Sequence, residues 1–506
     1  MIVFNFFKKI FAISLQISPI VTISFITTNC KNISIYSFTG GSDYLSGTFG
    51  NSGKDSKRWY IKTNNNDNYN GYIDWTIFPT IPGVSIDNGV VSWDSTVERG
   101  IHLFRIVAIV KNKRYASEDF VELYISHPYI SIQPTIDSSF EIKNFAGNNP
   151  NLQYSFDTEN WNEYSSVINI PKDKILYLKG NNPTGWSHSD ADWHNPRIRY
   201  TTFKFSGEVY VAGSVMALVD NGVGNTTIIP DGYCFSYLFS GCNNVKIINR
   251  EFLKKPTTLT ENCYGAMFSG CSSITIAPDL PAISLKERCY NYMFNGCSSL
   301  QIPPILPATS LVDKCYNGMF ENCTSLKNAP NLPATELADG CYTSMFANCT
   351  SLINAPNLPA ISLKESCYNN MFSGCSSLQI PPILPATELA EYCYNYMFNG
   401  CDSLTFAPEL PATILVNYCY YSMFSYCTSL TIAPDLLATS LIKGCYTNMF
   451  KGCESLKQIK LYYDGNYDET YFKNWVNGVN EDGIFYYNGN DTKEHFGLSS
   501  WTLKNF

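Results

Sequence analysis

Residues 263–288 read CYGAMFSGCSSITIAPDLPAISLKER, and residues 289–314 read CYNYMFNGCSSLQIPPILPATSLVDK. The same pattern continues to about residue 457, and its leading cysteine recurs every 26 residues, at Cys263, Cys289, Cys315, Cys341, Cys367, Cys393, Cys419 and Cys445. A degenerate earlier copy begins at Cys234. Self-similarity at a period of this size is typical of a repeat array. One such unit cannot bury its own apolar face, so we expect consecutive units to stack.

The unit that begins at Cys315 shows what one coil is expected to bury. The candidate core residues are Cys315, Met319, Phe320, Cys323, Leu326, Leu332 and Leu337. The i, i+4 spacing of Tyr316 and Phe320 predicts a short helical or 3₁₀ turn over residues 316–323. Residues 326–329 suit a short strand, and Pro330 is expected to end it because proline has no N–H for the ladder.

The pattern L…P…L…CYxxMFxGCxSL resembles the leucine-rich repeat of BspA-type bacterial surface proteins, over roughly residues 216–458. The sequence departs from that family in its period, which is 26 rather than roughly 23, and in its second cysteine. The resemblance implies a leucine-rich-repeat solenoid of nine cysteine-paired coils over 216–458, closed by a small C-terminal cap at 459–506. In the cap, Asp468 is expected to begin a helix, and Asp482-Gly483 to turn into a strand over Ile484–Tyr487.

Two β-sandwich-like domains are expected before the array. Within residues 31–127, Asn88-Gly89 separates two alternating apolar runs, which is a strong hairpin signal. The stretch 81–108 is similar to the immunoglobulin-like, cadherin-like domains of bacterial surface proteins, whose usual role is that of a spacer. Residues 128–215 hold five further candidate strands and are similar to the module that precedes the repeats in BspA-type proteins. This second β domain is also a candidate N-terminal cap for the array.

The first thirty residues resemble a signal peptide, because Lys8-Lys9 precedes an apolar run over residues 10–27. The alternative is an uncleaved anchor helix, since a run of that length nearly spans a bilayer. Cys30 follows the run at the position of the acylated cysteine of a bacterial lipoprotein, although Asn29 replaces the usual small residue. We therefore expect export to the bacterial cell surface or secretion.

Eighteen of the 19 cysteines form nine C-x₇-C pairs inside the array, and three interpretations of them compete. Buried free thiols are favoured, because free cysteine packs as a small hydrophobe. Disulfides within a coil, such as Cys315–Cys323, are permitted in an exported protein. Metal binding is least favoured, because zinc sites prefer closer cysteine spacing and the five histidines lie outside the array.

Two sets of candidate ligand-binding residues stand out. The segment GWSHSDADWHNP at 185–196 contains Trp186 and Trp193, which could stack on a sugar, although a loop with one inward tryptophan explains it as well. Variable residues after the strand leucine form the second set, which consists of Gln301, Lys327, Asn328, Gln379 and Thr405. Solenoids bind through extended surfaces of this kind. No residues are singled out as catalytic, cofactor-binding or metal-binding.

With a net charge of −8 and no basic stripe, the composition argues against nucleic acid or an anionic membrane surface as a partner. The resemblance implies a non-enzymatic, monomeric surface protein that binds host or environmental macromolecules, either protein or glycan. It would need no cofactor and would touch the membrane only through its signal or lipid anchor. The alternative is a carbohydrate-binding surface protein whose site lies in the β domain at 128–215.

Overall fold

The computed structural model describes residues 37–40, 44–48, 53–54, 59–62, 73–97, 100–110, 113–116, 121–126, 128–144, 150–187, 200–223 and 226–506. The chain divides into two compact units, Met1–His127 and Pro128–Phe506. The described structure is mainly β, with few and short helices. The predicted signal peptide, Cys30 and Trp193 lie outside the described residues.

The first unit consists of antiparallel and mixed sheets. Its five-stranded sheet has the order β2 (Tyr44–Thr48), β10 (Val121–Ser126), β8 (Gly100–Val110) and β5 (Asp74–Phe78), with β9 (Lys113–Ala116) also paired to β8. A three-stranded sheet has the order β3 (Gly53–Lys54), β7 (Val90–Trp93) and β6 (Val84–Asp87), and β1 (Ser37–Gly40) pairs with β4 (Trp59–Lys62). Side chains of β5, β6, β7 and β8 share one core. The predicted hairpin is confirmed, because Asn88 and Gly89 both have positive φ between β6 and β7.

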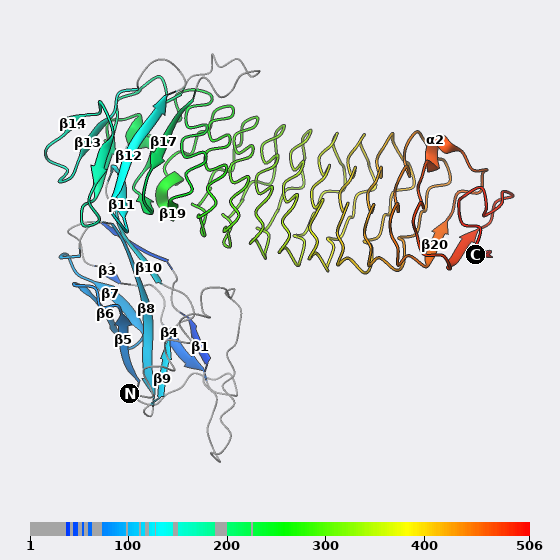
Figure 1. Cartoon of the computed structure of the whole chain (residues 1–506), viewed down its shortest axis with the longest axis horizontal. Coiled ribbons are helices and arrows are strands. Elements are labelled where there is room, and N and C mark those ends of the chain that lie inside the picture. The colour runs from blue at the N-terminus through cyan, green and yellow to red at the C-terminus, as the bar shows by residue number, and fades with distance from the viewer. Residues whose placement is uncertain are drawn as a thin grey trace. The chain divides into compact units, whose positions relative to one another are not determined.

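The second unit begins with two sheets that lead directly into the array (Figure 1). The larger sheet has the order β14 (Asn162–Glu163), β13 (Gln153–Ser155), β16 (Leu176–Lys179), β11 (Ile130–Pro134), β18 (Val209–Ala212) and β19 (Val245–Ile248). The smaller one has the order β15 (Ile168–Ile170), β12 (Ser138–Asn144) and β17 (Thr201–Phe205). Strand β19 belongs to the first coil and pairs in parallel with β18. One apolar core therefore runs without a break from Ile130 to Trp501.

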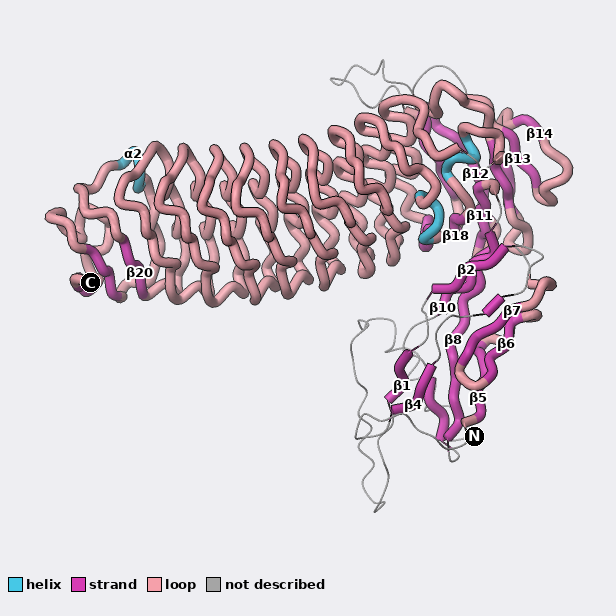
Figure 2. The backbone as a smooth tube through the Cα atoms, turned by 180° about the vertical axis from the view of Figure 1, so that it is seen from behind, coloured by secondary structure: helices cyan, strands magenta, loops and turns pink. Residues whose placement is uncertain are grey.

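The coils lie side by side in Figure 1, and Figure 2 shows that they consist almost entirely of turns and loops. We call residues 314–323, together with the equivalent residues of the other coils, the turn wall. In it, the amides of residues 317, 319, 321 and 323 donate to carbonyls three residues earlier, at 3.0–3.2 Å. The amides of residues 316, 318, 320 and 322 donate to residues 341, 343, 345 and 347 of the next coil, at 2.8–3.1 Å. Alternate amides thus stabilise the coil itself and its contact with the next one.

Every fourth residue of the turn wall has a positive φ, as at Lys314 (54°), Gly318 (57°) and Asn322 (62°). An i to i+3 hydrogen bond with positive φ at the third residue is typical of a type II turn. The predicted helical or 3₁₀ turn over 316–323 is therefore wrong. Overlapping turns place two residues inward and two outward, so residues four apart share a face as they do in a helix. The predicted strand at 326–329 is also too long, because only the single bridge Asn328↔Asn354 forms there.

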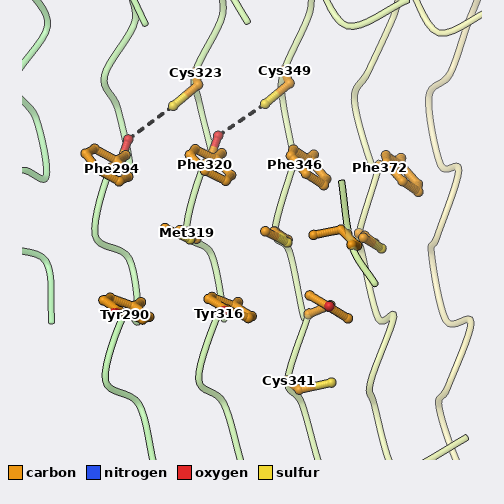
Figure 3. Packing of buried hydrophobic residues seen from close by; sticks show 14 of the residues in the cluster. Tyr290, Phe294, Tyr316, Met319, Phe320, Cys323, Cys341, Phe346, Cys349 and Phe372 are labelled. Carbon is orange, nitrogen blue, oxygen red and sulfur yellow. Dashed lines mark hydrogen bonds between the residues drawn. The ribbon is translucent and has the colours of Figure 1, made fainter. Parts of the chain in front are cut away.

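The seven residues predicted as the core of the coil that begins at Cys315 are all buried, as expected. Tyr316 is buried as well and stacks on Tyr290 and Tyr342 of the neighbouring coils, with ring centroids 5.8 Å apart. A second ladder stacks Phe320 on the equivalent phenylalanines at 5.6–5.8 Å. Figure 3 shows both ladders. Offset stacking at these separations is favourable beyond the area it buries.

The array ends in a small parallel sheet of β20 (Gln458–Leu461), β21 (Ile484–Tyr487) and β22 (Thr502–Lys504). The strand predicted at Ile484–Tyr487 is confirmed. The helix predicted from Asp468 begins there, because the Asp468 side chain accepts the amide of Thr470 at 2.7 Å. That helix, α2 (Glu469–Phe472), is shorter than the sequence suggested, and Asn474 already has a positive φ. Phe472 and Trp475 close the tyrosine and phenylalanine ladders.

Candidate functional site

Trp186 is not a ligand-binding residue. It is 2% exposed, its ring packs edge-on against Phe203, and its indole N–H donates to the carbonyl of Thr201 at 3.2 Å. A side chain held in this way cannot stack on a sugar, so the prediction for Trp186 is corrected. The tryptophan contributes instead to the core beneath the first coil.

The five polar residues predicted on the array lie just after the strand leucine, in two adjacent columns: Asn328 belongs to the second column and the other four belong to the first. Gln301, Asn328, Gln379 and Thr405 are exposed, and Lys327 is half-buried. The column of Asn328 also presents apolar side chains, of which Ile380 is 54% exposed and Phe406 is 51% exposed. The bridges Asn354↔Ile380 and Phe406↔Ile432 keep this column in register. It is an accessible surface that mixes polar and apolar side chains, since Ile302 precedes Asn328 and Ile380 follows Asn354.

The turn wall carries a second surface, which the sequence did not reveal. Its outward positions are occupied mainly by asparagine, serine, glycine and tyrosine. Five tyrosines gather in two successive coils, and we call Tyr392, Tyr396, Tyr418, Tyr421 and Tyr426 the tyrosine patch. All five are half-buried or exposed, and Tyr426 is 48% exposed. A composition of tyrosine, serine, glycine and asparagine is also typical of antibody combining sites.

Four of the five tyrosines contact one another. Tyr392 stacks on Tyr418 with centroids 5.1 Å apart. Tyr421 lies edge-on to Tyr396 at 5.3 Å and to Tyr418 at 5.9 Å. Tyr426 follows along the same coil, and its ring lies over Gly452 of the next coil, because a Cβ at Gly452 would come within 2.6 Å of that ring. Four rings of the patch therefore form one aromatic cluster that crosses from coil to coil, and Tyr426 lies further along the second coil.

The backbone of the patch is strained. Tyr392, Tyr396, Tyr418 and Tyr426 all have φ between 54° and 61°. A left-handed conformation costs a residue other than glycine about 1–2 kcal/mol. Other coils place glycine at the equivalent positions, namely Gly340 and Gly444 for Tyr392 and Tyr418, Gly318 for Tyr396, and Gly400 and Gly452 for Tyr426. The coil therefore does not require tyrosine at these positions, and the positive φ itself is common to the turn wall, since Arg288, Lys314 and Ser366 of other coils also have it.

Charges around the patch are few and engaged. The ammonium of Lys443 lies 5.7 Å from the centroid of Tyr418, and that of Lys451 lies 5.7 Å from the centroid of Tyr426. The Glu391 carboxylate accepts the side-chain amide of Asn417 at 2.7 Å. Burial, reinforced by a hydrogen bond with Tyr421, raises the pKa of the Tyr396 hydroxyl. The Tyr396 phenol therefore stays neutral near pH 7.

The cysteines do not form a reactive site. The structure agrees with the interpretation of buried free thiols for all eighteen cysteines of the array. The second thiol of each coil after the first donates to a phenylalanine carbonyl of the preceding coil, as Cys349 does to Phe320 at 3.1 Å (Figure 3), and Cys242 of the first coil donates to Phe203 of β17. Cys341 and Cys349 lie at opposite ends of the face drawn there, so a disulfide between them is excluded without rearrangement.

Burial raises the pKa of every thiol of the array, to about 12 for Cys367 and Cys375. The thiolate is the nucleophile and the metal ligand, so these cysteines are inert while they stay buried. Among the described residues, no three His, Cys, Asp or Glu side chains are grouped in a way that could hold a metal ion.

No family model, curated protein or solved structure matches this chain. Within the part of the chain that the structure describes, no helix is both long and apolar enough to cross a membrane.

Proposed function

We propose that the chain is an exported, non-enzymatic binding protein whose array recognises extracellular macromolecules by surface contact. In this proposal the array is a leucine-rich-repeat solenoid of the BspA type, preceded by an immunoglobulin-like spacer and a β domain that caps its first coil. The resemblance of the repeat supports this assignment, and so do the coil-to-coil hydrogen bonds and the closed core at both ends.

One observation carries the proposal, namely the group of five accessible tyrosines on the turn wall of two successive coils. Four of them stand where another coil has a glycine with positive φ, so the coil does not require a phenol ring there. Tyrosine is enriched at interfaces because its ring offers a large contact area at a low cost in side-chain entropy. The tyrosine patch is therefore the part of the array where partner recognition is expected.

A binding screen with the full chain tests this function. The chain is immobilised and exposed to extracellular-matrix proteins, mucins and polysaccharides, alongside a variant carrying Tyr418→Gly and Tyr426→Gly. We expect at least one of these macromolecules to bind the parent chain and to bind the double variant at least about tenfold more weakly, which corresponds to roughly 1.4 kcal/mol.

The matched control is Asn348→Gly, which alters a positive-φ residue of the turn wall in a coil that has no exposed tyrosine. This control should bind like the parent. If the control and the double variant bind equally well, the turn wall is not the recognition surface. If nothing in the screen binds, the binding function itself is contradicted.

A further inference from the structure

We infer that the array associates with a second copy of this chain, face to face and with the two arrays antiparallel. The contact would use the two columns described after the strand leucine and a third column, three residues beyond the second, over six coils. We call these three columns the mirror face. It belongs to a different stretch of the coil from the turn wall, so the inference does not depend on the tyrosine patch. It departs from the monomer that the resemblance implies.

The residues of the mirror face follow a mirrored order along the array. The six segments that carry it read, in chain order, TIAPD (275–279), QIPPI (301–305), KNAPN (327–331), INAPN (353–357), QIPPI (379–383) and TFAPE (405–409). The two central segments share both asparagines, the next two are identical, and the outer two each combine threonine, a large apolar residue and an acid. The order is therefore nearly the same when it is read from either end.

The apolar members of the mirror face are exposed. Ile305 is 72% exposed and Ile383 is 76% exposed, while Ile380 and Phe406 are about half-exposed. Between them lie four asparagines of the central coils, which are exposed as well. Large apolar side chains grouped on the surface mark a contact with another molecule.

The mirrored order specifies which molecule this is. In a two-fold contact the same surface is used by both copies, so residue i meets residue j and residue j meets residue i. A two-fold axis that runs along the strand direction, between the coils of Cys315 and Cys341, keeps each column opposite itself and reverses the order of the coils. Ile305 then faces Ile383 of the second copy, and asparagines of the two central coils face one another.

The mirror face is nearly flat, so two copies can meet along its whole length. Single parallel bridges hold its second column in register, as at Asn328↔Asn354 and Asn354↔Ile380. The stacked phenylalanine rings of successive coils, from Phe294 to Phe398, are inclined to one another by only 3–9° (Figure 3). Neighbouring strands of an ordinary sheet are rotated by roughly 20–25°. Because the coils repeat at one spacing with little rotation, coils of the two copies can stay opposite each other.

The chemistry of the facing groups favours this alignment. The exposed isoleucines would leave water on contact with each other, which is favourable in proportion to the apolar area removed. At the centre, side-chain amides can both donate to and accept from the amides of the second copy. An asparagine buried among apolar residues fixes register and orientation in coiled coils, and the central asparagines would do the same here.

The extent of the face predicts a weak dimer. Three residues in each of six coils give 18 side chains per copy, slightly fewer than the roughly 20–30 residues a side of a standard interface. At each end, Asp279 would face Glu409 of the second copy, and repulsion between these carboxylates limits the contact to six coils. We expect reversible association with a dissociation constant between about 1 and 100 µM.

Analytical ultracentrifugation of the full chain under reducing conditions, from about 1 to 300 µM, tests the inference. The mass should rise toward that of a dimer as the concentration rises. Ile305→Asn with Ile383→Asn should raise the dissociation constant at least about tenfold. The coil tolerates this change, because asparagine already stands at the equivalent positions, Asn331 and Asn357.

The matched control is Ile283→Thr with Ile361→Thr. These isoleucines are 71% and 64% exposed but belong to another column, where other coils have threonine, as at Thr309 and Thr335. This variant loses two exposed isoleucines outside the mirror face, so its dissociation constant should stay within about twofold of that of the parent.

Cross-linking tests the antiparallel alignment. Gln301 and Gln379 are exposed on the first column and would face each other across the contact. Two copies of Gln301, by contrast, would be displaced along the array by three coil spacings, or about 14 Å. A short bifunctional maleimide should therefore join Gln301→Cys to Gln379→Cys in a mixture faster than it joins either variant to itself. The parent chain, whose array thiols are buried, gives the background.

The outcomes decide the inference. A chain that stays monomeric up to the highest concentration would contradict it, and so would an asparagine variant that dimerises as tightly as the parent. If Gln301→Cys joins to itself as fast as to Gln379→Cys, the antiparallel alignment is wrong. Circular dichroism checks that each variant is folded, and the cysteine variants keep the inference testable if the asparagine variant is not.

Discussion

Alkaline pH should unfold the array, because eighteen thiols and a ladder of phenols are buried in their neutral form. Burial raises the pKa of Cys375 from 9.0 to about 12, and it raises the pKa of every other cysteine of the array in the same direction. The unfolded chain then loses protons from pH 9 upward while the folded chain keeps them. The stabilisation is fully present below pH 9 and is lost as the pH rises toward the folded value.

The loss of folding free energy can be calculated for each coil. At pH 10, a thiol whose pKa is near 9 in the unfolded chain and well above that in the folded chain lowers the free energy of unfolding by about 1.4 kcal/mol. Each coil contains two such thiols, so it loses about 3 kcal/mol. Native stability is roughly 0.05–0.15 kcal/mol per residue, or about 1–4 kcal/mol for a coil of this length. The buried tyrosines, such as Tyr342, whose pKa is also raised by burial, add to the loss above pH 10.

Circular dichroism and hydrogen exchange between pH 7 and 11, under reducing conditions, measure this effect. We expect amides of the array to lose protection between about pH 9 and 10.5 and to recover it at pH 7. Peptides from residues 73–97, which contain no cysteine, are the internal control and should stay protected longer. An array whose amides remain protected at pH 11 would refute this prediction, because the ionisation of eighteen buried thiols should have unfolded the array below that pH.

Three further predictions follow from the packing of the coils. Phe346→Ala should lower the free energy of unfolding by about 3–5 kcal/mol in urea, because the ring is fully buried between two stacked phenylalanines; a loss below about 1 kcal/mol would contradict the ladder. Gly318→Ala should cost more than Gly270→Ala, since both have positive φ but only Gly318 faces a ring, that of Tyr292; equal melting temperatures would count against that contact. A thiol reagent should label none of the array cysteines in the native protein and all eighteen in urea, and substantial labelling of the folded chain would disprove their burial.

The sequence was informative wherever a side chain had to be buried. The spacing of Cys315, Met319 and Phe320 predicted their burial correctly, because two inward residues in every four produce a recognisable pattern. Asn88-Gly89 and Asp468 were equally clear, since a two-residue turn and a helix cap depend on local chemistry.

The turn wall was misread because its periodicity imitates a helix. Overlapping turns bring Tyr316 and Phe320 to one face, as 3.6 residues per turn would also do. The available signal was the glycine or asparagine at many of the positive-φ positions, such as Gly318 and Asn322, because glycine and asparagine are poor helix formers. The tyrosine patch could not be foreseen for the same reason, because its residues come together only when the coils stack with that geometry.

The central claim is that residues 26 apart stack in register around one continuous core, and deletion of one coil tests it directly. Removing residues 341–366 joins Gly340 to Cys367 and leaves every remaining contact with an equivalent neighbour. Thermal unfolding followed by circular dichroism should show a cooperative transition within about 5 °C of that of the parent chain. Removing only residues 341–353 should abolish that transition, because the following coils would be out of register. A chain that tolerates both deletions equally, or that unfolds when the whole coil is removed, would contradict the account.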